Sequence, residues 1–258
     1  MPANIAAIAA KLGPDARRFD IDILASCDST NTVLLSRAET GAASGTVIIA
    51  EQQTAGRGRR GRQWFASPGD SLTFSLLWRF VPGTSPAGLS LAIGVAVART
   101  VARMGVSKLA LKWPNDILLD GRKLGGILVE LLPGAPHAAV IGIGLNLHLP
   151  AGMPDDVRGA SAAICTGEDA TDPNDICAPL LLELLAALES FAGGGFAALR
   201  SEWMAHHAFQ DAPVRLLSDF GPPLAGVCRS VDVDGALLLE VDGRVERILS
   251  GEISLRPA

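Results

Sequence analysis

The chain has 258 residues, of which 48% are hydrophobic and 19% are charged, and its formal net charge is −5. This length leaves room for one or two domains of about 150 residues each, and the apolar content excludes an intrinsically disordered chain. The acidic balance argues against bulk attraction to nucleic acid or an anionic membrane, and no uninterrupted apolar stretch approaches the ~18 residues of a membrane helix, so we expect a soluble protein.

The cysteine spacing argues against disulfides and against a metal site. Cys27, Cys165, Cys177 and Cys228 form no CxxC pair and have no histidines at metal-ligand spacing. Small buried thiols in a reducing compartment are the usual result of such a pattern. We therefore expect a cytoplasmic protein, and the cysteines and histidines assign no metal ligand with certainty.

Apolar periodicity and turn signals predict alternating helices and strands. In chain order, the expected helices cover 30–39, 86–104, 174–192 and 195–207, after a short helix or frayed end at 5–10. The expected strands cover 46–50, 71–80, 108–113, 117–119, 124–132 and 138–147, and residues 56–69 form a loop. From Ala212 onward, short strands separated by Asp-Gly turns indicate a small β-barrel or meander. The sequence thus predicts a mixed α/β domain at 1–210 and a small β domain at 211–258.

The first segment that suggests chemistry is a glycine- and arginine-rich loop. Residues 51–62 read EQQTAGRGRRGR. Its glycines allow the backbone to approach a ligand closely and to offer N–H groups, while its arginines stay protonated at any cellular pH. The loop suits a phosphate or a phosphate-linked intermediate. On composition alone, a solvated loop or a nucleic-acid contact stays open.

The second segment, at 112–116, reads KWPND. A lysine at a strand end, next to a tryptophan and a proline-stiffened turn, is held in place and can bind a carboxylate or a phosphate. Asn115 and Asp116 can orient Lys112, or Asp116 can bring Mg²⁺. Taken alone, the segment could also be a well-packed turn.

Two glycine-bearing strand segments complete the pattern. Residues 123–130 read KLGGILVE, and residues 142–146 read GIGLN. Glycines inside strands often mark a close approach of a ligand or another backbone. In the second segment, glycines alternate with larger residues and leave one face of the sheet open, where Asn146 can read the edge of a base or an amide. Each segment by itself is a weak signal.

Together, in this order and spacing, these segments resemble the biotin protein ligase (biotin–acetyl-CoA-carboxylase ligase) family. The resemblance spans some 120 residues, from the Asp-Ser-Thr-Asn turn at 28–31 to the GIGLN strand. It implies an α+β fold with a mixed β-sheet and helices, similar to class II synthetases, and a small C-terminal SH3-like β-barrel. Fewer than 30 residues precede Asp28, so we expect a short form without a DNA-binding domain.

The resemblance also assigns the candidate site residues. It places the following at biotin: Ser29, Thr30, Asn31, Gln53, Arg57, Gly58, Arg59 and Lys112. It places the following near the nucleotide: Arg59, Trp64, Asn115 and Asn146. Lys112 and Arg59 are the expected catalytic residues, because Lys112 lies at the biotin carboxylate and the adenylate phosphate in this family.

The implied reaction explains the positive charge. A carboxylate that attacks the α-phosphate of ATP brings two anions together, which Arg59, Lys112 and Mg²⁺ would neutralise. The mixed anhydride biotinyl-5′-AMP needs a loop that excludes water. A lysine of a biotin carboxyl carrier protein then takes the biotin, and Asp116 is the one candidate general base. We expect no nucleic-acid or membrane partner, and a sheet edge in such a fold leaves a homodimer open.

Three other functions stay in contention at this stage. A lipoate–protein ligase would share the fold, but its arginine-arginine-x-serine-glycine-glycine pattern is absent from the sequence. A nucleic-acid-binding module would need aromatic residues interleaved with the arginines, whereas only Trp64 and Phe65 lie beside this cluster. A protein that binds biotin without transferring it would not need both Lys112 and Arg59.

Overall fold

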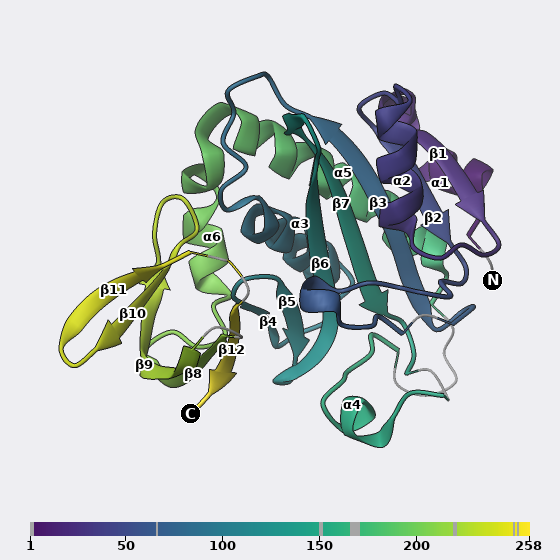
Figure 1. Cartoon of the computed structure of the whole chain (residues 1–258). Coiled ribbons are helices and arrows are strands. Elements are labelled where there is room, and N and C mark those ends of the chain that lie inside the picture. The colour runs from purple at the N-terminus through teal and green to yellow at the C-terminus, as the bar shows by residue number, and fades with distance from the viewer. Residues whose placement is uncertain are drawn as a thin grey trace.

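The computed structural model describes residues 3–65, 67–149, 152–165, 171–218, 221–249, 251 and 253–258. Figure 1 shows a large sheet with helices on both faces, followed along the chain by a smaller sheet at the C-terminal end. The large sheet has seven strands and the small one five. The expected combination of a mixed sheet, helices and a small β region is confirmed.

The large sheet runs in the order β1-β2-β3-β7-β6-β5-β4. Its strands are β1 (Asp20–Leu24), β2 (Thr46–Ala50), β3 (Ser71–Arg79), β4 (Leu109–Lys112), β5 (Asp116–Leu119), β6 (Arg122–Leu132) and β7 (Ala135–Asn146). Only β1 and β2 pair in parallel, and the other neighbours pair antiparallel. The long central strands β3, β7 and β6 put the glycine-bearing segments side by side.

Helices cover the two faces of this sheet unequally. The α-helices are α1 (Ile5–Leu12), α2 (Thr30–Glu39), α3 (Leu89–Arg103), α4 (Asp155–Gly159), α5 (Pro173–Gly194) and α6 (Arg200–Ala205). Short 3-10 turns cover Gly13–Arg18, Arg59–Gly61 and Gly195–Ala198. The large hydrophobic core joins α1, α3 and α5 to one face, whereas α2 packs on the other face through Leu34 and Ala38 against Ile48, Leu77 and Val140. Part of that second face is therefore free for a site.

The central helix α5 is long and apolar. Residues Pro173–Ala198 are long and apolar enough to cross a membrane by length and composition, and this is the one such segment among the described residues. In the structure, 61% of its most apolar 18-residue stretch is buried inside the protein. It packs against α1 and α3, as the core helix of a globular domain does.

The C-terminal sheet runs in the order β11-β10-β9-β8-β12 and is antiparallel throughout. Its strands are β8 (Ala212–Ser218), β9 (Gly221–Val231), β10 (Leu237–Val241), β11 (Arg244–Ile248) and β12 (Ile253–Pro257). The turn between β9 and β10 contacts the main domain, because the Trp113 indole N–H donates to the Gly235 carbonyl at 3.0 Å. The division at 210/211 into separately folding domains stays a prediction.

The structure differs from the sequence predictions at a few elements. Helix α3 begins at Leu89 and not at Pro86, because Gly88 takes a φ of 77° and closes a left-handed turn against Phe196. Strand β1 and the short helix α4 were not predicted. The segment expected as a second long helix at 195–207 is a 3-10 turn followed by α6. All four cysteines are free thiols, as expected.

Candidate active site

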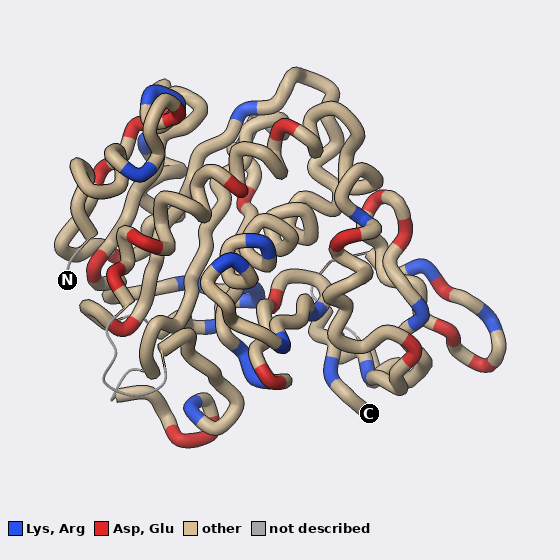
Figure 2. The backbone as a smooth tube through the Cα atoms, turned by 180° about the vertical axis from the view of Figure 1, so that it is seen from behind, with Lys and Arg blue, Asp and Glu red and all other residues tan. Residues whose placement is uncertain are grey.

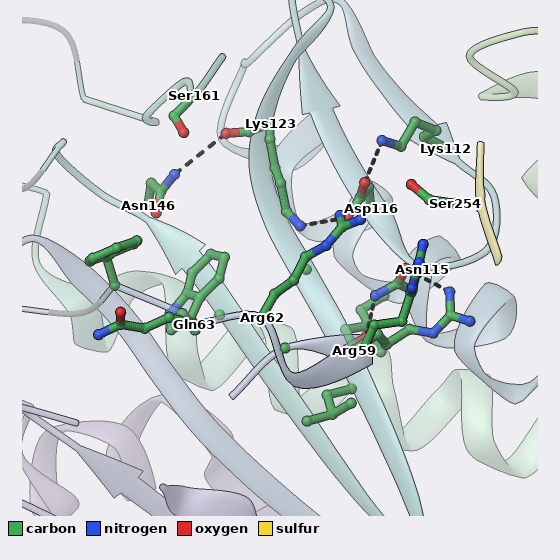
Figure 3. A pocket seen from close by; sticks show the side chains of 18 of the residues that line it. Arg59, Arg62, Gln63, Lys112, Asn115, Asp116, Lys123, Asn146, Ser161 and Ser254 are labelled. Carbon is green, nitrogen blue, oxygen red and sulfur yellow. Dashed lines mark hydrogen bonds and ion pairs between the residues drawn. The ribbon is translucent and has the colours of Figure 1, made fainter. Parts of the chain in front are cut away.

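A cavity of about 720 Å³ lies on the face of the large sheet that α2 covers only in part. Its walls come from the start of α2, the arginine-rich loop, the turn between β4 and β5, strands β6 and β7, and β12 of the small sheet. Every residue that the sequence analysis assigned to biotin, to the nucleotide or to catalysis lines this cavity. Figure 3 shows ten of the lining residues by name. The structure therefore brings the predicted site residues together in one place.

Glycines form the floor of the cavity. Val140, Gly142 and Gly144 alternate on one face of β7; Val140 is covered by α2, and the two glycines face the cavity. A Cβ atom at Gly142 would lie 2.3 Å from Asn31 Oδ1, and one at Gly144 would lie 2.4 Å from the Trp64 ring. The expected open face thus exists, and it allows Asn31 and Trp64 to lie directly on the strand.

One end of the cavity, which we call the neutral end, is lined by the uncharged side chains of Ser29, Thr30, Asn31 and Gln53. The Thr30 N–H donates to Gln53 Oε1 at 2.7 Å, while the Asn31 amide donates to Glu130 at 2.7 Å and to the Leu128 carbonyl at 3.2 Å. Ser29 is the N-cap of α2, but its side chain makes no capping hydrogen bond although it is only 4% exposed. Ser29 lines the cavity at the N-terminus of the helix.

The arginine-rich loop folds back on itself across the mouth of the cavity. The N–H of Gly58 donates to the Arg62 carbonyl at 2.7 Å, and that of Trp64 to the Gly56 carbonyl at 2.8 Å. Arg57 forms an ion pair with Glu130 at 2.9 Å. The Arg59 guanidinium donates to Asn115 Oδ1 at 3.3 Å and also to the Gly251 carbonyl. Arg59 therefore connects the loop to the β4–β5 turn and to the C-terminal region.

The other end of the cavity holds a carboxylate between two lysines. Lys112 Nζ lies 2.5 Å from Asp116 Oδ2, and Lys123 Nζ lies 2.6 Å from Asp116 Oδ1, as Figure 3 shows. Burial raises the pKa of the Asp116 carboxyl, but the charges of Lys123 and Lys112 overcome this effect and hold that pKa at about 2. Burial lowers the pKa of Lys112, against the pull of Asp116.

Such a carboxylate is a weak base at neutral pH. Its pKa therefore argues against Asp116 as the general base of the transfer step. The geometry instead makes it the group that fixes two ammonium ions at one end of the cavity.

The two candidate asparagines are held by the protein itself. Asn115 Nδ2 donates to the Ile127 carbonyl at 2.8 Å, so its amide aligns the β4–β5 turn with β6. Asn146 Nδ2 donates to the Ala162 carbonyl at 3.0 Å and connects the end of β7 to the segment before residue 166. Both side chains line the cavity, and both also shape it.

Several basic and polar residues that line the cavity were not predicted from the sequence. Lys123 was considered only as the start of a glycine-bearing strand, although a second lysine one hairpin away from Lys112 was a usable signal. Arg62, Ser254 and Arg256 also line the cavity. Burial and the neighbouring charge of Arg256 lower the pKa of the Arg62 guanidinium. In Figure 2, several basic segments gather in the lower centre, between the two sheets.

Comparisons with known proteins show which family the chain resembles in sequence. The family described as biotin/lipoate A/B protein ligase matches residues 23–146. The bifunctional ligase/repressor BirA of Escherichia coli is 42% identical over 92% of this chain and 74% of its own length. The biotin–[acetyl-CoA-carboxylase] ligase of Mycobacterium tuberculosis is 37% identical over 90% of this chain and 88% of its own.

This chain belongs to the biotin protein ligase family. A biotin protein ligase from Aquifex aeolicus, solved with biotin and ATP, matches the fold with a TM-score of 0.79 at 27% identity, over 93% of this chain and 99% of that one. The fold, the cavity and the relatives of this family member thus point to the same kind of protein.

Proposed function

We propose that this biotin protein ligase activates biotin with ATP to biotinyl-5′-AMP in the 720 Å³ cavity and then passes biotin to a lysine of a biotin carboxyl carrier protein. The single observation that carries this proposal is the two-ended cavity. A neutral, hydrogen-bonded end at the start of α2 and a cationic end at Lys112 and Lys123 are joined by a floor of glycines. The enzyme from Aquifex aeolicus that shares the fold holds biotin and ATP.

The neutral end suits the ureido ring of biotin. That ring carries one carbonyl acceptor and two N–H donors, which need fixed partners in a water-poor site. Ser29 and the first N–H groups of α2 can donate to the carbonyl. We assign the remaining ring contacts to Thr30, Asn31, Gln53 and the Arg57–Arg59 segment, all of which line the cavity.

The cationic end suits the reacting anions. The biotin carboxylate and the α-phosphate of ATP repel each other, and cations fixed in advance lower that barrier. We assign this role to Lys112, Arg59 and Lys123. Arg62 and Arg256 add charge at the same end and suit the phosphates that leave. The Lys112 side chain is only 11% exposed, which strengthens its interaction with an anion.

The nucleotide itself belongs beside Trp64, Asn115 and Asn146. Trp64 offers a flat ring for a base to stack on, and the two asparagines hold the surrounding backbone. Mg²⁺ is a proposed companion of ATP. Among the described residues, no group of three His, Cys, Asp or Glu side chains could hold a metal ion. Mg²⁺ is usually held by one or two carboxylates together with substrate phosphates, so we propose that the ion arrives with ATP.

Four further assignments accompany this proposal. The carrier is the biotin carboxyl carrier domain of a carboxylase, in line with the name of the relative from Mycobacterium tuberculosis. A net charge of −5 supports a function without nucleic acid. The four free thiols support a cytoplasmic location. A homodimer through a sheet edge is compatible with the fold.

ATP–pyrophosphate exchange on the purified chain with Mg²⁺ tests the proposal, with biotin, lipoate or no acid added. We expect exchange with biotin alone, followed by transfer of biotin to a carrier domain. Exchange with lipoate alone would contradict the assignment of the neutral end and leave the adenylation chemistry intact. Absence of exchange with either acid would refute the proposed activity.

A further inference from the structure

Strand β3 presents a row of three hydroxyl groups toward the cavity side of the sheet. Ser71, Thr73 and Ser75 alternate along the strand, so their side chains point to the same face. Ser75 Oγ lies 2.7 Å from Thr30 Oγ1 and 2.6 Å from Asn31 Oδ1. Among the described residues, the hydroxyls of Ser71 and Thr73 are buried without any hydrogen-bond partner. An unpartnered buried hydroxyl destabilises the protein that carries it.

Thr73 differs from Ser71 in its access to the site. It is 4% exposed and lines the cavity, whereas Ser71 does not. Thr73 lies directly opposite Gly144 of the cavity floor, and Trp64 lies on that glycine. The Thr73 hydroxyl is therefore a buried donor in the wall of the cavity, and the free protein gives it nothing to bind.

The register of β3 fixes where along the cavity this donor lies. Thr73 is two residues, or about 7 Å, from Ser75, which contacts the Thr30 and Asn31 end. Ser71, two residues further, pairs with Asn146 at the far end of β7. Thr73 thus lies one row beyond the neutral end, in the row that continues across Gly144 and Gly126 to Asp116 between the two lysines.

We propose that the Thr73 hydroxyl donates a hydrogen bond to the thioether sulfur of bound biotin and so selects for the sulfur-containing ring. This inference rests on the proposed function. If the ureido group occupies the neutral end and the carboxylate lies at the lysines, the sulfur is the acceptor that biotin offers between them. A thioether is a weak acceptor, and burial without water favours its use.

The test is a comparison of two acids on three proteins. Isothermal titration calorimetry measures the affinities of biotin and of desthiobiotin, which lacks the sulfur, for the wild type, Thr73→Val and Thr73→Ser. Valine replaces the hydroxyl by a methyl group, and serine keeps the hydroxyl. We expect Thr73→Val to weaken biotin about fivefold and desthiobiotin less than about twofold, while Thr73→Ser stays close to the wild type.

The thermal stability of the ligand-free protein gives a second measurement. Thr73→Val should raise this stability while it lowers the affinity for biotin. Because the valine removes an unpartnered hydroxyl, the Tm of ligand-free Thr73→Val should rise by about 2–4 °C. Ser71→Ala is the matched control: it removes the other unpartnered hydroxyl, so it should also raise the Tm but leave the affinity for biotin unchanged. A Thr73→Val protein that is more stable and yet binds biotin less well has lost a ligand contact, because general damage to the fold would lower its stability as well.

Two results would overturn the inference while the proposed function stands. One is an equal loss of affinity for both acids in Thr73→Val, which would place the hydroxyl on a group that they share. The other is an unchanged affinity for biotin in that variant. If the wild type binds no biotin at all, the proposed function itself is wrong, and the role of Thr73 falls with it.

Discussion

Replacing Asp116 by asparagine removes the negative charge that separates Lys112 and Lys123. The pKa of the Asp116 carboxyl is about 2, against an ordinary 3.8, and each pH unit of that difference corresponds to about 1.4 kcal/mol. The ionised carboxylate therefore contributes about 2 kcal/mol to the free energy of unfolding at neutral pH. We expect Asp116→Asn to lose about that amount, which lowers the Tm by about 4–8 °C.

The same substitution should damage the adenylation step. Without their common partner the two ammonium groups repel each other and leave their positions, and a displacement of about 1 Å can reduce a rate about 100-fold. ATP–pyrophosphate exchange with biotin measures adenylation. Single-turnover transfer from preformed biotinyl-5′-AMP to a carrier domain measures the second step separately.

Asp156→Asn is the control for this experiment. Asp156 is an exposed carboxylate at the rim of the same cavity, so its neutralisation should change neither the Tm nor the exchange rate by much. The reasoning is refuted if Asp116→Asn keeps normal exchange and loses only the transfer step. That result would restore Asp116 as the general base, despite its low pKa.

Four further predictions follow from particular contacts. Gly142→Ala should weaken biotin more than about tenfold in calorimetry, because its Cβ would lie 2.3 Å from Asn31 Oδ1; normal affinity would contradict the role of this floor. Trp113→Phe loses the hydrogen bond to Gly235 and should lower the free energy of unfolding by about 1–3 kcal/mol in urea titrations. An unchanged free energy of unfolding would show that this contact is dispensable. Since the pKa of Asp116 is lower in the folded than in the unfolded protein, its stabilising contribution is present above about pH 4 and disappears as the pH falls toward about 2. Acid titrations should therefore be steeper for the wild type than for Asp116→Asn, and identical slopes would exclude this coupling. Chelation with EDTA should stop exchange until Mg²⁺ is restored, while Mg²⁺ alone should give no binding heat with the ATP-free protein; exchange that survives chelation would remove Mg²⁺ from the proposal.

Local sequence rules account for most elements but not for every boundary. Helix α2, strand β2 and the central strands were predicted within a residue or a few, because N-cap residues mark the start of the helix and β-branched or apolar runs mark the strands. The start of α3 was predicted three residues too early, since the left-handed turn at Gly88 depends on Phe196, which is distant in the sequence. Such a packing contact leaves no local signal.

The sequence by itself determined the family resemblance and the candidate site residues that turn out to line the cavity, because the loop, the KWPND turn and the glycine strands are continuous segments with fixed spacing. Only the tertiary structure decided how these groups interact. Asp116 lies between two lysines because the register of β4, β5 and β6 brings them together. Ser254 and Arg256 line the cavity because β12, which begins more than a hundred residues after the end of β7, lies beside it. Thr73 lies opposite a glycine of β7, with the Trp64 ring over that glycine, and its buried hydroxyl has no partner there. Pairing and burial of this kind depend on three-dimensional neighbours, and those neighbours are absent from any single segment of the sequence.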